Sequence, residues 1–222
     1  MADFDTHASG YTAGPPRQVP GYAGLLRMTT LLLAERMPSA GRVLVLGAGG
    51  GLELRAFAEA QAGWTFDGVD PSEKMLELAA ETVGDHRARV TLHLGTIEVA
   101  PEGLFDGATC ILTFHFIARE ERLETLRQIR RRLRPGAPFI LAHISFPQSE
   151  PERSQWIARH VMFGAADGTD PGQLEAAQQA IGTRLNILAP EDEEAMLRDA
   201  GFSDVTLFYA AFSFRGWVAY AA

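Results

Sequence analysis

The sequence is poor in cysteine, in long apolar runs and in positive charge, and each shortage excludes a class of protein. A single cysteine, Cys110, excludes an internal disulfide. No apolar run approaches the roughly 18 residues that a membrane-spanning helix needs. The formal net charge of -8 argues against a general binder of nucleic acids or anionic membranes, because both partners require a basic face. We therefore expect no membrane partner, and a nucleic acid only at a local basic patch.

What remains is the composition of an ordinary globular protein. The chain has 222 residues, of which 46% are hydrophobic and 22% are charged, and this is enough for one domain with a single large core. The opening residues MADFDTH have neither the basic nor the apolar segment of a signal peptide. We therefore expect one domain over residues 1–222, located in the cytoplasm.

Strand-like and helix-like segments alternate through most of the chain. Strands are predicted at RVLVLG (42–47), TFDGVD (65–70), RVTLHLG (89–95), GATCILTF (107–114) and PFILAHIS (138–145). Helices are predicted over 52–62, 72–83, 120–133 and 189–201, and the tail DVTLFYAAFSFRGWVAYA (204–221) reads as two antiparallel strands. This order predicts a doubly wound α/β fold, with a mostly parallel seven-stranded sheet, helices on both faces and an antiparallel C-terminal strand.

The stretch VLVLGAGGGLELRAF (43–57) carries the strongest functional signal. A strand-like run enters a glycine-rich turn and then a helix, where backbone N–H groups point outward and glycine lets a ligand approach them. The glycines are Gly47, Gly49, Gly50 and Gly51. Dinucleotide sites use the spacing G-x-G-x-x-G, and here the third position of that pattern is Leu52. The spacing therefore argues against a dinucleotide site.

An acidic residue follows the loop at the spacing at which ribose-binding carboxylates are found in such folds. Asp70 ends the second predicted strand, roughly 20 residues after the loop, where a carboxylate can accept both hydroxyls of a bound ribose. The alternative is that Asp70 only caps the helix that begins near Ser72. The loop and the acidic strand end together favour a nucleoside-containing ligand.

On these residues the chain resembles the class I S-adenosylmethionine-dependent methyltransferases from about Arg42 to the C-terminus. The segments that carry the resemblance are GAGGG, GVDPSEKML, FDGATCILTFHF, LRPGAPFILAHI and AGFSDVTLFYAAFSFRGWVAY. Within that superfamily, VPGYAGLLRMTTLLLAERM and the tail resemble the carboxy-S-adenosylmethionine synthase group, which serves the modification of wobble uridine in tRNA. The resemblance implies a Rossmann-like methyltransferase fold and S-adenosylmethionine as the cofactor.

The resemblance also implies which residues bind the cofactor. The glycine loop lines its methionine and ribose portion, Asp70 binds the ribose hydroxyls, Pro71 lies against the adenine, and Thr96 and Ile97 meet the adenine edge. The implied set is Tyr22, Gly47, Ala48, Gly49, Gly51, Asp70, Pro71, Met75, Thr96, Ile97 and Ile111.

Several positions depart from the family pattern. Many members have an acidic residue where this chain has Val45, and an aspartate that reads adenine where this chain has Thr96. Ile111 stands where the carboxy-cofactor group has an asparagine. That group also binds the extra carboxylate with an arginine, and the position here is Gln178 or Gln179. Because the charge-assisted partner is missing, ordinary S-adenosylmethionine is favoured.

Two segments outside the alternation fit the resemblance. Residues 1–37 form an irregular arm and a helix, predicted to lie over the cofactor with Tyr22 touching it. Residues 145–190 take the place where relatives build a substrate cap. There Trp156, His160 and Phe163 share one helical face, which forms a pocket roof or a homodimer surface unless it packs on the core.

The catalytic candidate is His115, just past the fourth predicted strand, although a packing role is the alternative. No Cys/His or His/carboxylate cluster has metal-ligand spacing, so no metal is predicted. The leading prediction is a methyltransferase acting on a small molecule. The alternatives are an enzyme of the carboxylated cofactor in tRNA modification, a non-catalytic S-adenosylmethionine-binding domain and, last, a dehydrogenase.

Overall fold

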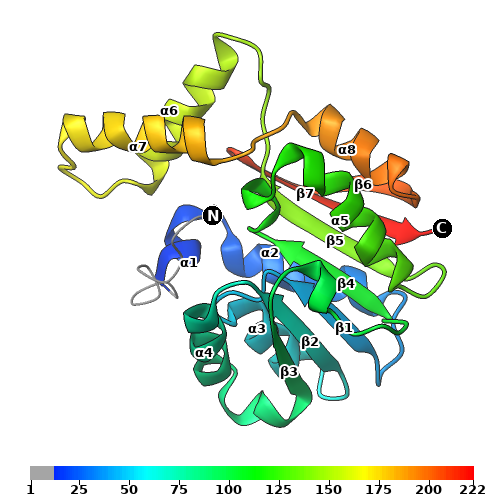
Figure 1. The fold of residues 1–222 in the computed structure, drawn as a ribbon. Helices are drawn as coiled ribbons and strands as arrows, with labels where there is room; N and C mark the ends of the chain where they lie inside the picture. Colours follow the sequence, from blue (N-terminus) through cyan, green and yellow to red (C-terminus); the bar gives the residue numbers. More distant parts are fainter. Residues whose placement is uncertain (1–12) are drawn as a thin grey trace.

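A seven-stranded sheet forms the centre of the molecule (Figure 1). The structure is a computed structural model that describes residues 13–222. The strands are β1 (Arg42–Leu46), β2 (Thr65–Asp70), β3 (Val90–Leu94), β4 (Gly107–Ile111), β5 (Pro138–Ile144), β6 (Phe202–Ala211) and β7 (Phe214–Ala221). Their order is β3-β2-β1-β4-β5-β7-β6, with β7 antiparallel to both of its neighbours and the first five strands parallel. The predicted fold class is confirmed.

Helices cover both faces of this sheet (Figure 1). The helices are α1 (Gly14–Gln18), α2 (Tyr22–Ala34), α3 (Leu52–Ala60), α4 (Glu73–Thr82), α5 (Arg119–Arg131), α6 (Glu152–Gly164), α7 (Pro171–Arg184) and α8 (Pro190–Asp199). Successive strand residues point to opposite faces. In β1, Val43 and Val45 join a core cluster with α2 and α3, whereas Leu44 and Leu46 join one with α5 and α8. The continuous apolar run of β1 therefore follows from its burial on both faces.

The fourth strand is shorter than predicted. It ends at Ile111, Leu112 adopts a positive φ of 57°, and Phe114–Phe116 form a 3₁₀ turn. The Leu112 N–H still donates to the Ala142 carbonyl of β5 at 2.7 Å, so the chain turns away only after this bond. The turn places Thr113, just after the carboxyl end of β4, next to Gly47 of the glycine loop.

The segment between β5 and α8 projects from the body as α6 and α7 (Figure 1). The predicted face of α6 packs on the turn between β6 and β7, where His160 Nδ1 lies 2.7 Å from Ser213 Oγ. The rings of Trp156 and Phe163 lie 5.7 Å and 5.3 Å from the ring of Phe212. This face of α6 therefore contacts the β6–β7 turn, although Phe163 is still 45% exposed, so the pocket roof and the homodimer surface stay predictions. Helix α7 has no buried residue. None of the described helices is both long and apolar enough to cross a bilayer.

Candidate functional site

The loop between β1 and α3 has a conformation that requires glycine. Gly47, Gly49 and Gly51 have φ values of 77°, 44° and 80°, in the left-handed region. A Cβ atom at Gly47 would lie 2.0 Å from Thr113 Oγ1, beyond the end of β4. A Cβ atom at Gly51 would lie 2.8 Å from the Cα atom of Ala79 in α4. The loop is therefore packed tightly between β4 and α4.

Asp70 connects the end of β2 to this loop. Its Oδ2 accepts a hydrogen bond from the Gly49 N–H at 2.9 Å, and its Oδ1 accepts one from the Ser72 N–H at 3.0 Å. The cap of α4 is Ser72, whose Oγ accepts from the Met75 N–H at 3.2 Å. Asp70 is thus more than a helix cap, and each of its oxygens has a second lone pair for a ligand hydroxyl.

Asp70 as a whole residue is only 8% exposed. Burial raises its pKa above the usual range, and the hydrogen bonds from the Ser72 and Gly49 N–H groups oppose that rise. Additional donors would stabilise the carboxylate further, as expected of a group that receives a ligand.

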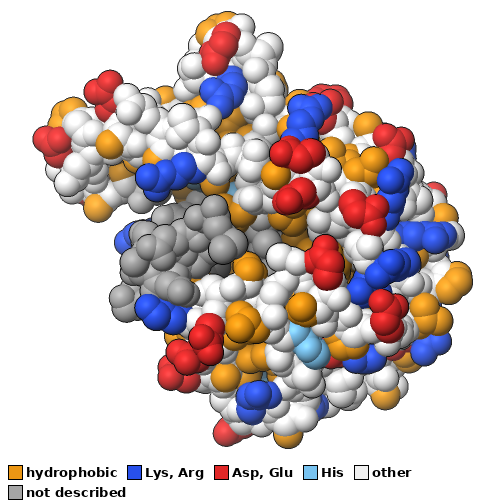
Figure 2. Space-filling model, viewed as in Figure 1, with side chains coloured by type: hydrophobic (Ala, Val, Ile, Leu, Met, Phe, Trp, Pro, Cys, Tyr) orange, Lys and Arg blue, Asp and Glu red, His pale blue; other side chains and the backbone are white. Residues whose placement is uncertain are grey.

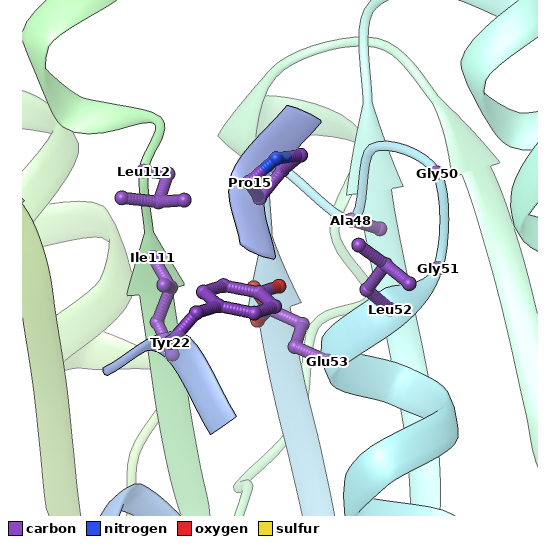
Figure 3. A pocket seen from close by; sticks show the side chains of 10 residues that line it. Pro15, Tyr22, Ala48, Gly50, Gly51, Leu52, Glu53, Ile111 and Leu112 are labelled. Atoms are coloured by element: carbon purple, nitrogen blue, oxygen red, sulfur yellow. The ribbon is translucent and has the colours of Figure 1, made fainter. Parts of the chain in front are cut away.

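A small cavity lies under the loop (Figure 3). Five of the predicted cofactor residues line it: Tyr22, Gly47, Ala48, Gly51 and Ile111. Pro15 of α1 and Glu53 of α3 also line it. Its volume is about 20 Å³, whereas pockets for drug-sized ligands measure roughly 300–1,000 Å³. We therefore expect a ligand of that size to displace Pro15 or Tyr22, the two lining residues that come from the N-terminal helices.

The predicted adenine-binding residues lie elsewhere on the same sheet edge. Pro71 is exposed directly after Asp70. Thr96 is also exposed, and its hydroxyl donates to the Glu98 carboxylate, which lowers the pKa of Glu98. Ile97 is buried in the core on the α5 face of the sheet. Contact of these residues with adenine stays a prediction.

His115 lies in the 3₁₀ turn after β4 and is 4% exposed. Burial lowers its pKa well below the usual range, and the nearby charges of His143 and Arg122 act in the same direction. Its Nδ1 has no hydrogen-bond partner among the described residues, and its ring centroid lies 6.0 Å from that of His143. His115 is thus buried and is not among the residues that line the cavity.

Glu53 is a site residue that was not predicted. A sequence signal existed, because Glu53 lies four residues before Phe57 and so shares the core-facing stripe of α3. The hydrogen bond that holds its carboxyl comes from Thr109 in β4, which is distant in sequence. Over residues 13–222, no group of three or more His, Cys, Asp and Glu side chains is placed to hold a metal ion.

The sheet order, the glycine loop after β1 and the carboxylate at the end of β2 define the Rossmann-like fold of the class I S-adenosylmethionine-dependent methyltransferases. Residues 44–139 match the family model described as a methyltransferase domain. The carboxy-S-adenosyl-L-methionine synthase of Aeromonas hydrophila is 25% identical over 207 residues, which cover 91% of this chain and 83% of that protein. The predicted resemblance, both to the superfamily and to the synthase group, is confirmed.

Solved structures show the same fold. A protein assigned as an O-methyltransferase in Nostoc punctiforme superposes with a TM-score of 0.67 at 22% identity over 90% of this chain. Human N-acetylserotonin methyltransferase, in complex with S-adenosylmethionine, has a TM-score of 0.60 at 15% identity over 87% of this chain. This chain spans 57% and 52% of the lengths of those two structures.

Proposed function

We propose that this chain binds S-adenosylmethionine at the carboxyl edge of the sheet and transfers its methyl group to a small-molecule acceptor. The observation that carries the proposal is the Asp70 carboxylate, buried at the end of β2 and bonded to the Gly49 N–H. A ribose has two adjacent hydroxyl donors, and Asp70 has two oxygens to accept them. The methyltransferase family model and the relatives support the same cofactor.

The residues around the loop suit the needs of methyl transfer. The bound cofactor supplies an electrophilic methyl group, so the protein must align the acceptor and exclude water. Pro15 and Tyr22 line the cavity between the loop and the end of β4, and would close the site against solvent. We propose His115 as the general base for an acceptor that must lose a proton and that reaches its buried ring; its lowered pKa keeps the imidazole neutral but makes it a weak base.

A second candidate is an enzyme that makes or uses the carboxylated cofactor, as the name of the Aeromonas relative suggests. Against it, Gln178 is half-buried and Gln179 exposed on α7, so neither provides a cation. None of the described residues that line the cavity is basic. Mass spectrometry of the ligand released from the purified protein separates the two candidates.

The α6–α7 segment and the surface charge indicate what kind of acceptor the chain would bind. We propose that residues 145–190 act as a substrate cap within one domain, since α6 is fixed on the β6–β7 turn and α7 projects from it. On the face shown in Figure 2, basic and acidic side chains of the described residues alternate rather than form a basic surface. This distribution favours a small acceptor over tRNA.

The proposed cofactor should stabilise the purified protein. We expect S-adenosylmethionine and its demethylated product to raise the melting temperature and to give a binding isotherm in calorimetry, because each has a ribose for Asp70. NAD should give neither effect, since Leu52 stands at the third-glycine position of the dinucleotide pattern. Binding of NAD alone would overturn the proposed function.

Cofactor binding should also stabilise part of the arm, where α1 is already formed and Val19 is buried in the core. Tyr209 donates a hydrogen bond to the Pro20 carbonyl, which fixes the arm at that point. Residues 13–19 precede it, and we expect a ligand to displace Pro15 or Tyr22. Hydrogen exchange should therefore show slower exchange in residues 13–19 with S-adenosylmethionine and little change in α2.

Equal protection of residues 13–19 with and without ligand would show that this part of the arm does not close over the cofactor. The matched control is the Tyr209→Phe variant, which removes the bond to Pro20. In that variant, residues 13–19 should exchange faster in the free protein. The rest of the predicted arm, including Tyr11, lies outside the described residues.

A further inference from the structure

Glu53 places a carboxyl group inside the cavity under the glycine loop. It is the second residue of α3 and is 6% exposed. Its Oε1 accepts a hydrogen bond from Thr109 Oγ1 at 2.8 Å, and Thr109 is fully buried in β4. Figure 3 shows Glu53 beside the ring of Tyr22, between the loop and the end of β4.

Among residues 13–222, the surroundings of this carboxyl contain no compensating charge. None of the described side chains that line the cavity is basic. Burial raises the pKa of Glu53 to about 8, even though the hydrogen bond from Thr109 lowers it. The titratable groups next to it are Tyr22 from α2 and the buried Cys110 thiol, whose own pKa is raised by burial and by Glu53. A carboxyl buried in this way is costly unless a cation joins it.

The proposed cofactor provides such a cation. Its amino acid end carries an ammonium group with three N–H donors, whereas its sulfonium has charge but no hydrogen to donate. We infer that Glu53 binds the ammonium group of the cofactor's amino acid end, an inference that rests on the proposed function. Thr109 would then hold one carboxylate oxygen and leave the other directed to the ligand.

Binding of this kind releases a proton. Without ligand the carboxyl is largely protonated at neutral pH, and the ammonium group favours its ionised form. Cofactor affinity should therefore rise as the pH approaches about 8, and fall again at higher pH, where the ammonium group of the ligand loses its proton. Calorimetry in two buffers of different ionisation enthalpy measures the proton released.

The test compares two ligands that differ at the amino acid end. S-adenosylhomocysteine has the ammonium group, and 5′-methylthioadenosine lacks the whole amino acid portion. In Glu53→Gln we expect the dissociation constant of S-adenosylhomocysteine to rise about tenfold and the proton release to disappear. The affinity for 5′-methylthioadenosine should stay unchanged, because glutamine still accepts the Thr109 hydrogen bond.

The outcomes separate this inference from the proposed function. The control Glu59→Gln changes an exposed carboxyl on the same helix and should leave both affinities unchanged. Equal weakening of both ligands in Glu53→Gln, or no weakening at all, would overturn the role of Glu53 and leave the proposed function standing. Failure of the unmodified protein to bind either ligand would overturn both.

Discussion

Replacement of Arg122 by methionine is expected to lower the free energy of unfolding by about 3–5 kcal/mol. Arg122 Nη1 donates to Glu193 Oε1 at 2.6 Å, and the two side chains are 0% and 1% exposed. The guanidinium also donates to the carbonyls of Ile117 and Asn186. Methionine would leave the Glu193 carboxylate buried without its cation. Urea denaturation followed by circular dichroism measures the loss.

An exposed pair provides the control. Arg55 donates to Glu59 at 2.7 Å on the surface of α3, with side chains 57% and 52% exposed. Because solvent screens such a pair, Arg55→Met should cost less than about 1 kcal/mol. A similarly small loss for Arg122→Met would contradict the argument. The double variant Arg122→Met/Glu193→Leu should recover much of the stability, since it removes both buried charges.

The same pair predicts how stability depends on pH. Burial acts to raise the pKa of Glu193, but His143, 3.4 Å away, and Arg122 outweigh it, so the pKa is lowered overall. A lowered pKa in the folded state gives stability that is present above the unfolded value of about 4.5 and lost as the pH falls through the folded value. In the Arg122→Met variant, the pKa of Glu193 loses one of the interactions that lower it. The free energy of unfolding should therefore fall less on acidification than in the unmodified protein.

The sheet was predictable because its signals are local. Strands buried on both faces are continuous apolar runs, as in β1 and β5, and the helices between them imply parallel pairing. The end of β4 was not predictable, because Thr113 and Phe114 favour a strand by type. The turn there is instead set by contacts with the distant glycine loop and with Ala142 in β5.

The candidate site divides in the same way. Asp70 and the glycine loop were predictable, because their spacing along one strand-turn-helix unit sets their contact. Glu53 was missed, since a glutamate in the first turn of a helix is ordinarily a solvated group that suits the helix dipole. Its spacing to Phe57 places it on the core-facing stripe of α3, but only Thr109, brought alongside by the pairing of β4 with β1, shows what the buried carboxyl contacts.

Asp70→Ala is expected to weaken binding of S-adenosylmethionine by about a hundredfold or more, because two hydrogen bonds to a charged group are lost and each contributes roughly 1.5–3 kcal/mol. The variant loses both ribose contacts and the bond to the Gly49 N–H. Asp70→Asn should fall in between, since its amide retains one acceptor oxygen and places donors beside the Gly49 or Ser72 N–H. Calorimetry gives the dissociation constants.

Asp67 supplies the control, because it is a buried aspartate on the same strand. Its Oδ2 accepts from Arg42 Nε at 2.7 Å and its Oδ1 lies 2.8 Å from His93 Nε2, away from the glycine loop. Asp67→Ala should therefore lower the melting temperature and leave cofactor affinity unchanged, whereas Asp70→Ala should mainly lower affinity. If Asp70→Ala stays folded and binds the cofactor as tightly as the unmodified protein, Asp70 serves only to hold the loop. The ribose contact, on which the proposed function depends, would then be wrong.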